Sequence, residues 1–289
     1  MFDTPHFRSA FVEATRHDGR VAMGLAWSPD IGNQLDKIAT EIDYIELSYE
    51  QLKSKPELLE MIGDLPIILH CASLSIGGFV LPDTDLLKDV VAVTKTTKTP
   101  WLGEHLAFIT ADSTNSKPTN IGFTLCPQLS EETLDQTCKN IATISEQLSV
   151  PLLLENPPQY FKMPGSTMDL PVFIERMCER TNVSLLVDLT HLFIAGNNMG
   201  WDPMEALDRW PLDRVVEVHL SGANYASGRW WDNHAMAASS QIFELLDALA
   251  QNAHPSAITM EYNWIPHVSS SFLHEQIARV RETSWNPLC

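Results

Sequence analysis

Short apolar runs alternate along this chain with longer segments in which apolar residues recur at helical spacing. A short apolar run bounded by turn residues is typical of a strand buried on both faces of a parallel sheet. Eight runs of this kind are predicted strands, at residues 20–27, 43–49, 65–70, 100–108, 150–156, 183–188, 214–222 and 256–263.

A segment of helical pattern follows each predicted strand, and Asp83 and Ser130 are candidate N-caps for two of these segments. The predicted helices cover residues 33–42, 51–64, 83–98, 130–149, 169–182, 202–211, 239–253 and 272–283. The polar stretches 110–129 and 223–234 are predicted to be loops.

Repeated strand–helix units predict a parallel sheet with right-handed crossovers, and eight such units predict a closed barrel. We therefore expect an α/β protein with the TIM (β/α)8 barrel fold. The sequence contains no composition break or Pro/Gly/Ser-rich linker, so a single domain over residues 1–289 is expected. Residues 1–19 precede the first strand and are predicted to form an N-terminal arm.

Histidines and carboxylates occur where the predicted strands end, in runs such as PIILH, PLLLE and EVH. In a TIM barrel the C-terminal ends of all strands meet at one face, which is where active sites lie. These residues are therefore predicted to face one mouth. They are His70, His105, Glu155, Asp188, His191, His219, Asp232, His234 and Glu261.

Five imidazoles and four carboxylates exceed the needs of one metal ion, and they predict two or three ions with a bridging carboxylate such as Glu155. Mixed nitrogen and oxygen ligands suit iron, manganese or zinc. Each residue also has a plain structural interpretation; Asp188, for example, could cap a helix that begins beside it. It is the recurrence at equivalent positions that favours a metal centre.

Further polar and aromatic residues near these strand ends are weaker candidates for contacts with substrate or with the ligands. Asn156 follows Glu155 directly, and an aromatic loop precedes Asp232. The full set of weaker candidates is Ser75, Asn156, Asn224, Tyr225, Arg229 and Trp230.

The formal net charge of −18 opposes binding to nucleic acid, whose phosphates require a basic face. No apolar run is long enough to cross a bilayer, so no membrane partner is expected. The first residues lack the basic-then-apolar layout of a secretory signal, and the five cysteines form no C-x-x-C pair. A cytoplasmic location is therefore expected.

Several local motifs resemble those of one known family. They are H-x-x-x-L-S-I-G beginning at His70, G-E-H ending at His105, L-E-N around Glu155, N-N-M-G-W-D-P ending at Pro203, and E-V-H-L-S-G around His219. Together they resemble the multinuclear non-heme iron-dependent oxidative enzymes of the MbnB/TglH/ChrH group, over roughly residues 20–280. The order of the nine ligand candidates also resembles the trinuclear zinc arrangement of endonuclease IV, so the expected barrel is of the xylose-isomerase and endonuclease-IV type.

The family resemblance implies two or three iron ions, Fe(II) and Fe(III), with O2 as cosubstrate. It also implies a ribosomally made precursor peptide as substrate, whose cysteine is oxidised, and a partner protein that binds the leader of that peptide. The favoured reaction is TglH-like excision of the cysteine Cβ as formate from a peptide C-terminus. MbnB-like formation of an oxazolone and thioamide is the alternative within the family.

Carried over by position, the resemblance implies three ligand groups. The first comprises His70, His105 and Glu155, the second Asp188, His219 and Glu261, and the third His191, Asp232 and His234. Many members of the family have D-x-N-N where this chain has D-L-T-H at 188–191, so the imidazole of His191 stands in place of an asparagine.

A zinc or manganese hydrolase or sugar isomerase on the same barrel is the alternative outside the family. An isomerase needs a base, often Lys or Glu, between the metal and the sugar. The lysines of this chain fall in predicted helices and loops, which favours the oxidative enzyme.

Overall fold

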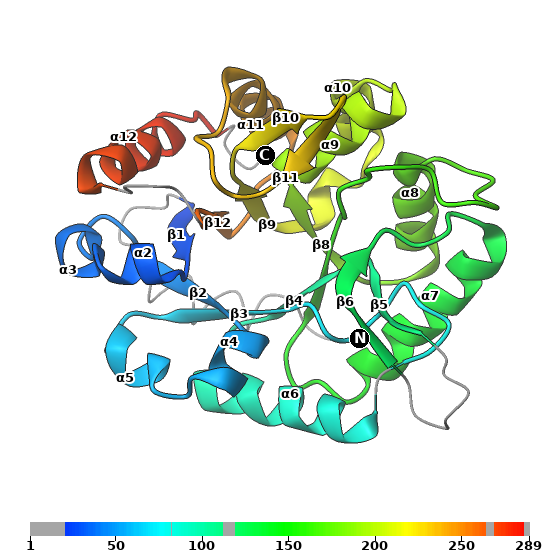
Figure 1. Ribbon diagram of the computed structural model, residues 1–289, viewed down its shortest axis with the longest axis horizontal. Helices are drawn as coiled ribbons and strands as arrows, with labels where there is room; N and C mark the ends of the chain where they lie inside the picture. The colour runs from blue at the N-terminus through cyan, green and yellow to red at the C-terminus, as the bar shows by residue number, and fades with distance from the viewer. Residues whose placement is uncertain (1–20, 82, 112–118, 264–268, 286–289) are drawn as a thin grey trace.

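The computed structural model describes residues 21–81, 83–111, 119–263 and 269–285. Eight parallel strands form a closed barrel in the order β1-β12-β9-β8-β7-β4-β3-β2, and helices surround this ring (Figure 1). The barrel strands are β1 (Ala22–Ala26), β2 (Tyr44–Ser48), β3 (Ile67–Cys71), β4 (Leu102–His105), β7 (Leu152–Glu155), β8 (Ser184–Asp188), β9 (Val215–Leu220) and β12 (Ala257–Met260). The predicted TIM barrel is confirmed.

Helices follow the barrel strands on the outside of the ring, and the last of them, α12, comes after the final strand. They are α2 (Pro29–Gly32), α3 (Leu35–Ile38), α4 (Tyr49–Ser54), α5 (Leu58–Ile62), α6 (Thr84–Thr97), α7 (Glu131–Ser145), α8 (Leu170–Arg180), α9 (Leu189–Met199), α10 (Pro203–Arg209), the 3-10 turn η1 (Leu212–Arg214), α11 (Ser240–Asn252) and α12 (Ser270–Arg281). Asp83 and Ser130 cap α6 and α7 as expected, each accepting a hydrogen bond from a backbone N–H of the first turn.

Alternation of side chains along each strand divides the barrel interior into an apolar floor and a polar mouth. Tyr44, Ile68, Leu153 and Leu186 belong to one buried apolar cluster. Two residues further along, the same strand faces carry Glu46, His70, Glu155 and Asp188. Because successive side chains of a strand point to opposite faces, these polar groups project inward above the floor.

Two segments predicted as loops contain β-hairpins. Within 110–129, β6 (Thr119–Leu125) pairs antiparallel with β5 (Phe108–Ala111), and within 223–234, β10 (Ala223–Ala226) pairs antiparallel with β11 (Arg229–Asp232). The loop predictions were therefore wrong for these parts. Both hairpins follow barrel strands directly, so they rise from the C-terminal face of the barrel.

Three predicted helices also differ from the structure. Within the helix expected at 33–42, only α3 is helical. The helix expected at 51–64 is divided into α4 and α5 around Pro56, because proline lacks the N–H that a continuous helix needs. The helix after β8 was expected only from residue 202, but α9 already begins at Leu189, directly after the strand.

The described helices include none with the length and apolar character that a membrane crossing requires. The predicted arm at 1–19 lies outside the described residues.

Candidate metal centre

All nine predicted ligands lie at the C-terminal mouth of the barrel. The register of the sheet explains part of this convergence, because Glu155 pairs with His105 across β7 and β4, and Asp188 pairs with His219 across β8 and β9. The nine side chains fall into the three predicted groups, and within each group one ligand atom per residue lies within 4.8 Å of the others.

The first group centres on Glu155, which is 1% exposed. Its Oε2 lies 2.7 Å from Nε2 of His70 and 3.3 Å from Nε2 of His105. Gly103 makes room for this arrangement, because a Cβ at that position would lie 2.9 Å from Cδ2 of His70. A side chain on Gly103 would therefore push the His70 ring away from the carboxylate.

The second group joins three neighbouring strands. Asp188 ends β8, His219 lies on β9, and Glu261 directly follows β12. Asp188 and His219 are fully buried. Nδ1 of His219 lies 3.7 Å from Oε1 of Glu261. Asp188 also caps α9, since its Oδ1 accepts a 2.6 Å hydrogen bond from the backbone N–H of His191; its other oxygen, Oδ2, remains for a ligand.

The third group combines α9 with the β10–β11 hairpin. Oδ2 of Asp232 lies 3.1 Å from Nε2 of His191 and 2.7 Å from Nε2 of His234. Nδ1 of His191 lies 3.0 Å from Oε1 of Glu155, which links this group to the first. His234 adopts a left-handed backbone conformation, with φ of 52°, which directs the chain back toward the mouth after the hairpin.

The chemistry and spacing of these atoms fit metal ions. Buried polar atoms normally have hydrogen-bond partners. Yet, among the described residues, five of the nine predicted ligands each have a buried side-chain atom without one: His105 Nδ1, Asp188 Oδ2, His219 Nδ1, Asp232 Oδ1 and His234 Nδ1. The contacts of 2.7–3.7 Å also resemble the roughly 3.0–3.5 Å between neighbouring ligands of one ion at about 2.1 Å from each.

Burial and the neighbouring carboxylates shift the pKa values of the imidazoles in opposite directions. Burial lowers the pKa of His70, but its hydrogen bond with Glu155 and the carboxylate charge outweigh burial and raise the pKa to about 9. Burial is likewise opposed at His234, where Asp232 contributes most to raising the pKa to about 10. For His105 burial prevails and lowers the pKa to about 4. The carboxylates therefore favour positive charge at His70 and His234, and a bound cation would supply such charge in place of these protons.

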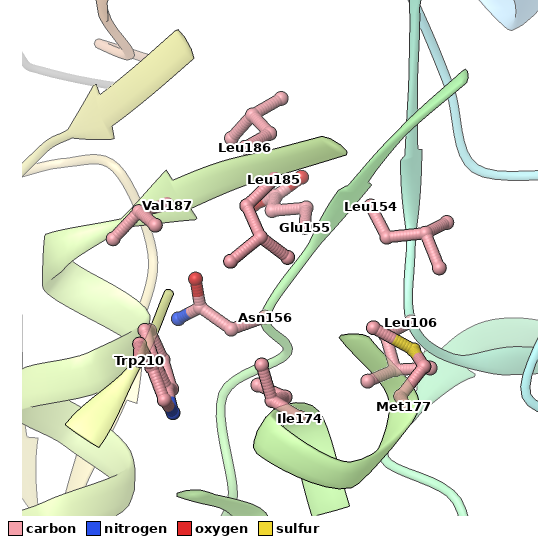
Figure 2. Close-up of a pocket in the computed structure, with 10 residues that line it drawn as sticks. All are labelled: Leu106, Leu154, Glu155, Asn156, Ile174, Met177, Leu185, Leu186, Val187 and Trp210. Atoms are coloured by element: carbon pink, nitrogen blue, oxygen red, sulfur yellow. The ribbon is translucent and has the colours of Figure 1, made fainter. Parts of the chain in front are cut away.

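Asn156, one of the weaker candidates, holds the end of β8 in place. Its amide Nδ2 donates a 2.8 Å hydrogen bond to the carbonyl oxygen of Asp188, and its Oδ1 accepts one of 2.9 Å from the Asp188 N–H. Figure 2 shows Asn156 among apolar residues that include Val187, Ile174 and Trp210. In this apolar layer an unpaired backbone group would be costly, so Asn156 fixes the position from which Asp188 reaches the mouth.

Replacing Asn156 by alanine is expected to lower the free energy of unfolding by about 2–4 kcal/mol, because two buried backbone groups of Asp188 lose their partners. Equilibrium denaturation in urea measures the change. Asn252, at the exposed end of α11, provides a matched control, and Asn252→Ala should change stability by less than about 0.5 kcal/mol. Equal stability of the two variants would contradict this role of Asn156.

The other weaker candidates surround the mouth. The Ser75 hydroxyl is buried and accepts hydrogen bonds from the N–H groups of Ile109 and Thr110, so it holds the β5 strand. Within the other hairpin, Asn224 pairs with Trp231, and Tyr225 is 59% exposed.

The last two weaker candidates brace the same hairpin. The Trp230 ring packs edge-on against Phe193 of α9 at 4.9 Å between ring centroids. The Arg229 guanidinium donates a hydrogen bond to the carbonyl oxygen of Tyr160, in the loop after β7. These contacts connect the β10–β11 hairpin to α9 and to that loop.

Two buried carboxylates near the centre were missed by the sequence prediction. Glu46 lies on β2 and Glu217 on β9. One carboxylate oxygen of each lies within 4.8 Å of a ring nitrogen of His219. Glu217 had a readable signal, because in EVH it lies two residues before His219 and therefore on the same face. Glu46 lies within the run YIELS, where nothing marks it as different from a surface carboxylate.

Comparison with known proteins gives one family. Residues 22–284 match the family described as RiPP precursor modification enzyme MbnB/TglH/ChrH, where RiPP denotes a ribosomally synthesised and post-translationally modified peptide. A UPF0276 protein of Caulobacter vibrioides is 30% identical over 254 residues, covering 86% of this chain and 89% of that protein. A UPF0276 protein of Streptomyces avermitilis is 29% identical, and the match covers only 52% of its length.

Among solved structures, endonuclease IV from Thermus thermophilus has the same architecture. It aligns with a TM-score of 0.52 over 90% of this chain and 99% of its own, at 13% sequence identity. At this identity the likeness concerns the fold, and it supports the expected endonuclease-IV type of barrel.

Proposed function

Because this chain belongs to the MbnB/TglH/ChrH family of RiPP precursor modification enzymes, we propose that it oxidises a cysteine residue of a precursor peptide with O2 and two or three iron ions. The favoured form of the reaction is excision of the cysteine Cβ as formate from the C-terminus of the peptide. The observation that carries the proposal is the convergence of three linked groups of nitrogen and oxygen ligands at one barrel mouth.

Each ligand group would hold one ion. His70, His105 and Glu155 would bind the first, and Asp188, His219 and Glu261 the second. His191, Asp232 and His234 would bind the third. When bound, iron supplies a cation for the substrate thiolate and the means to activate O2.

Protein side chains would place the ions close together. Glu155 contacts members of the first and third groups, and its two oxygens face different groups, Oε2 toward His70 and Oε1 toward His191. Glu155 also forms a possible ligand group with Asp188 and His191, so it is suited to bridge the first ion and the ion held by Asp188. Bridging would keep both ions within reach of one cysteine side chain, which reduces the entropy lost when the reacting groups meet.

Exposed aromatic residues beside the mouth support a peptide substrate. Trp231 stacks on Tyr160 with ring centroids 4.8 Å apart, and it remains 38% exposed. Aromatic surfaces of this kind contribute strongly to peptide binding. The acidic chain also disfavours nucleic acid as an alternative substrate.

We further propose a cytoplasmic location and a partner protein that presents the leader of the precursor.

Metal analysis combined with a peptide assay tests the function. Protein purified without oxygen should contain two or three iron ions per chain, with an Fe(II)/Fe(III) pair in its Mössbauer spectrum. With O2 and cysteine-containing peptides encoded beside its gene, together with a co-encoded partner, it should consume O2 and release formate. A peptide with serine in place of cysteine is the control and should give no formate.

Other results would redirect the assignment. Peptide modification without formate, giving a product with oxazolone and thioamide groups, would favour the MbnB-like reaction. Stoichiometric zinc or manganese, with no iron retained and no O2 consumed, would contradict the oxidative function. It would favour a hydrolase or sugar isomerase on the same barrel.

A further inference from the structure

A network of buried polar side chains surrounds His219 inside the barrel mouth. Glu46 is 3% exposed, and Glu217, His219 and Thr259 are fully buried. Of these four residues, only His219 belongs to the predicted ligand groups. Such groups are costly to bury unless each finds a partner, so their arrangement calls for a functional explanation.

The two nitrogens of His219 face different surroundings. Nε2 lies 2.9 Å from Oε2 of Glu46, which is hydrogen-bond distance. Nδ1 is buried without a hydrogen-bond partner among the described residues, and it faces Oε1 of Glu261 at 3.7 Å. In a neutral imidazole only one nitrogen carries a proton, and the other has the lone pair that a metal needs.

Glu217 lies further from His219 than Glu46 does and has other partners. Its Oε1 is 3.5 Å from Nε2 of His219 but accepts a 2.9 Å hydrogen bond from the Thr259 hydroxyl. Its Oε2 accepts one of 2.7 Å from Nε1 of Trp101. Glu46 is therefore the principal acceptor for His219.

We propose that Glu46 is a positioning residue, which accepts the Nε2–H of His219 and so presents Nδ1 of that ring to the second ion. This inference rests on the proposed metal centre. A carboxylate that receives the far N–H of a ligating histidine fixes the ring and its tautomer and makes the ring a stronger ligand. Without this acceptor, the proton is free to move to Nδ1, where it competes with the metal.

Metal affinity of two Glu46 variants tests the proposal. Glu46→Leu removes the acceptor at similar volume; because loss of one member of a buried pair is destabilising, circular dichroism first checks that the variant is folded. It should weaken binding of the second ion by about 10- to 100-fold, measured by competition with a chromophoric chelator under anaerobic conditions. Glu46→Gln keeps an acceptor oxygen and should lose less than about 10-fold on the same scale.

Tyr44→Phe is the matched control. The Tyr44 hydroxyl lies in the same buried network, 2.7 Å from Oγ1 of Thr259, which lies 3.4 Å from Oε2 of Glu46 and 2.9 Å from Oε1 of Glu217. The variant therefore removes a hydroxyl from the network while Glu46 remains. The Tyr44→Phe variant should bind the second ion with the affinity of the unaltered protein. Wild-type affinity in Glu46→Leu would overturn the proposal. So would equal, severe losses in Glu46→Leu and Glu46→Gln, because Glu46 would then act as a ligand itself.

A direct measurement makes the test independent of whether the Glu46 variants fold. In zinc-loaded protein with 15N-labelled histidine, NMR should show His219 protonated at Nε2 and metal-bound at Nδ1, with its signals identified by their loss in His219→Gln. Metal bound at Nε2 would overturn the proposal. Failure of the unaltered protein to bind iron, manganese or zinc would instead contradict the proposed metal centre.

Discussion

Replacing Glu155 by alanine is expected to abolish activity and to weaken the binding of more than one ion. This carboxylate contacts three imidazoles. Its Oε2 lies 2.7 Å from Nε2 of His70 and 3.3 Å from Nε2 of His105, and its Oε1 lies 3.0 Å from Nδ1 of His191. Burial raises the pKa of Glu155, but the surrounding histidines outweigh burial and hold the pKa well below its usual range. This direction favours the ionised form of Glu155 at neutral pH.

The loss should be large because removal of Glu155 affects two ligand groups together. Replacing a residue that only supports a metal ligand costs about 10- to 100-fold in affinity, so loss of a shared ligand should cost more than about 100-fold. Iron content per chain and the rate of O2 consumption with peptide measure the effect. Circular dichroism shows whether the barrel remains folded.

Glu205→Ala is a suitable control for this experiment. Glu205 is an exposed carboxylate in the first turn of α10, so its removal changes the net charge equally without touching the mouth. This variant should retain full iron content and activity. A folded Glu155→Ala variant with wild-type activity would contradict the proposed role of Glu155.

The barrel and its polar mouth were predictable because both follow from alternation along buried strands. An apolar run that ends on His70, Glu155 or Asp188 places that side chain at the same end of every strand, whatever the details of the helices between them. The grouping of ligands in threes came from the family resemblance instead. Strand order alone does not give distances across the mouth.

Features that depend on contacts between distant segments were not predictable from local pattern. In β6 only three apolar residues alternate, Ile121, Phe123 and Leu125, and the strand is largely exposed, so its pairing with β5 is what fixes it. The hairpin before Asp232 is similar: Asn198 of α9 bonds both the N–H and the carbonyl of Trp230. Glu46 becomes distinctive only when the closed barrel brings β2 close to β9.

The family resemblance implies an asparagine where this chain has His191, and this difference leads to a selective prediction. His191→Asn should weaken binding of the third ion by about 10- to 100-fold, while the first two ions remain bound. The ring supplies Nε2 at 3.1 Å from Oδ2 of Asp232. An amide oxygen is a weaker ligand than imidazole for iron or zinc.

The helix that carries His191 should remain intact in this variant. Its first turn is capped through the backbone N–H of residue 191, which donates to Asp188 whichever side chain is present. His274→Asn is the matched control, since His274 lies on α12 and pairs with Glu41 at the surface. Titration with Fe(II) under anaerobic conditions, read by metal content after desalting, separates the ions by affinity.

Loss of all ions together would mean that the groups act as one unit, and an unchanged third ion would show that His191 is not its ligand. If instead the two remaining ions sustain O2-dependent release of formate from peptide, the third ion serves to hold the β10–β11 hairpin over the mouth and is not needed for the reaction itself.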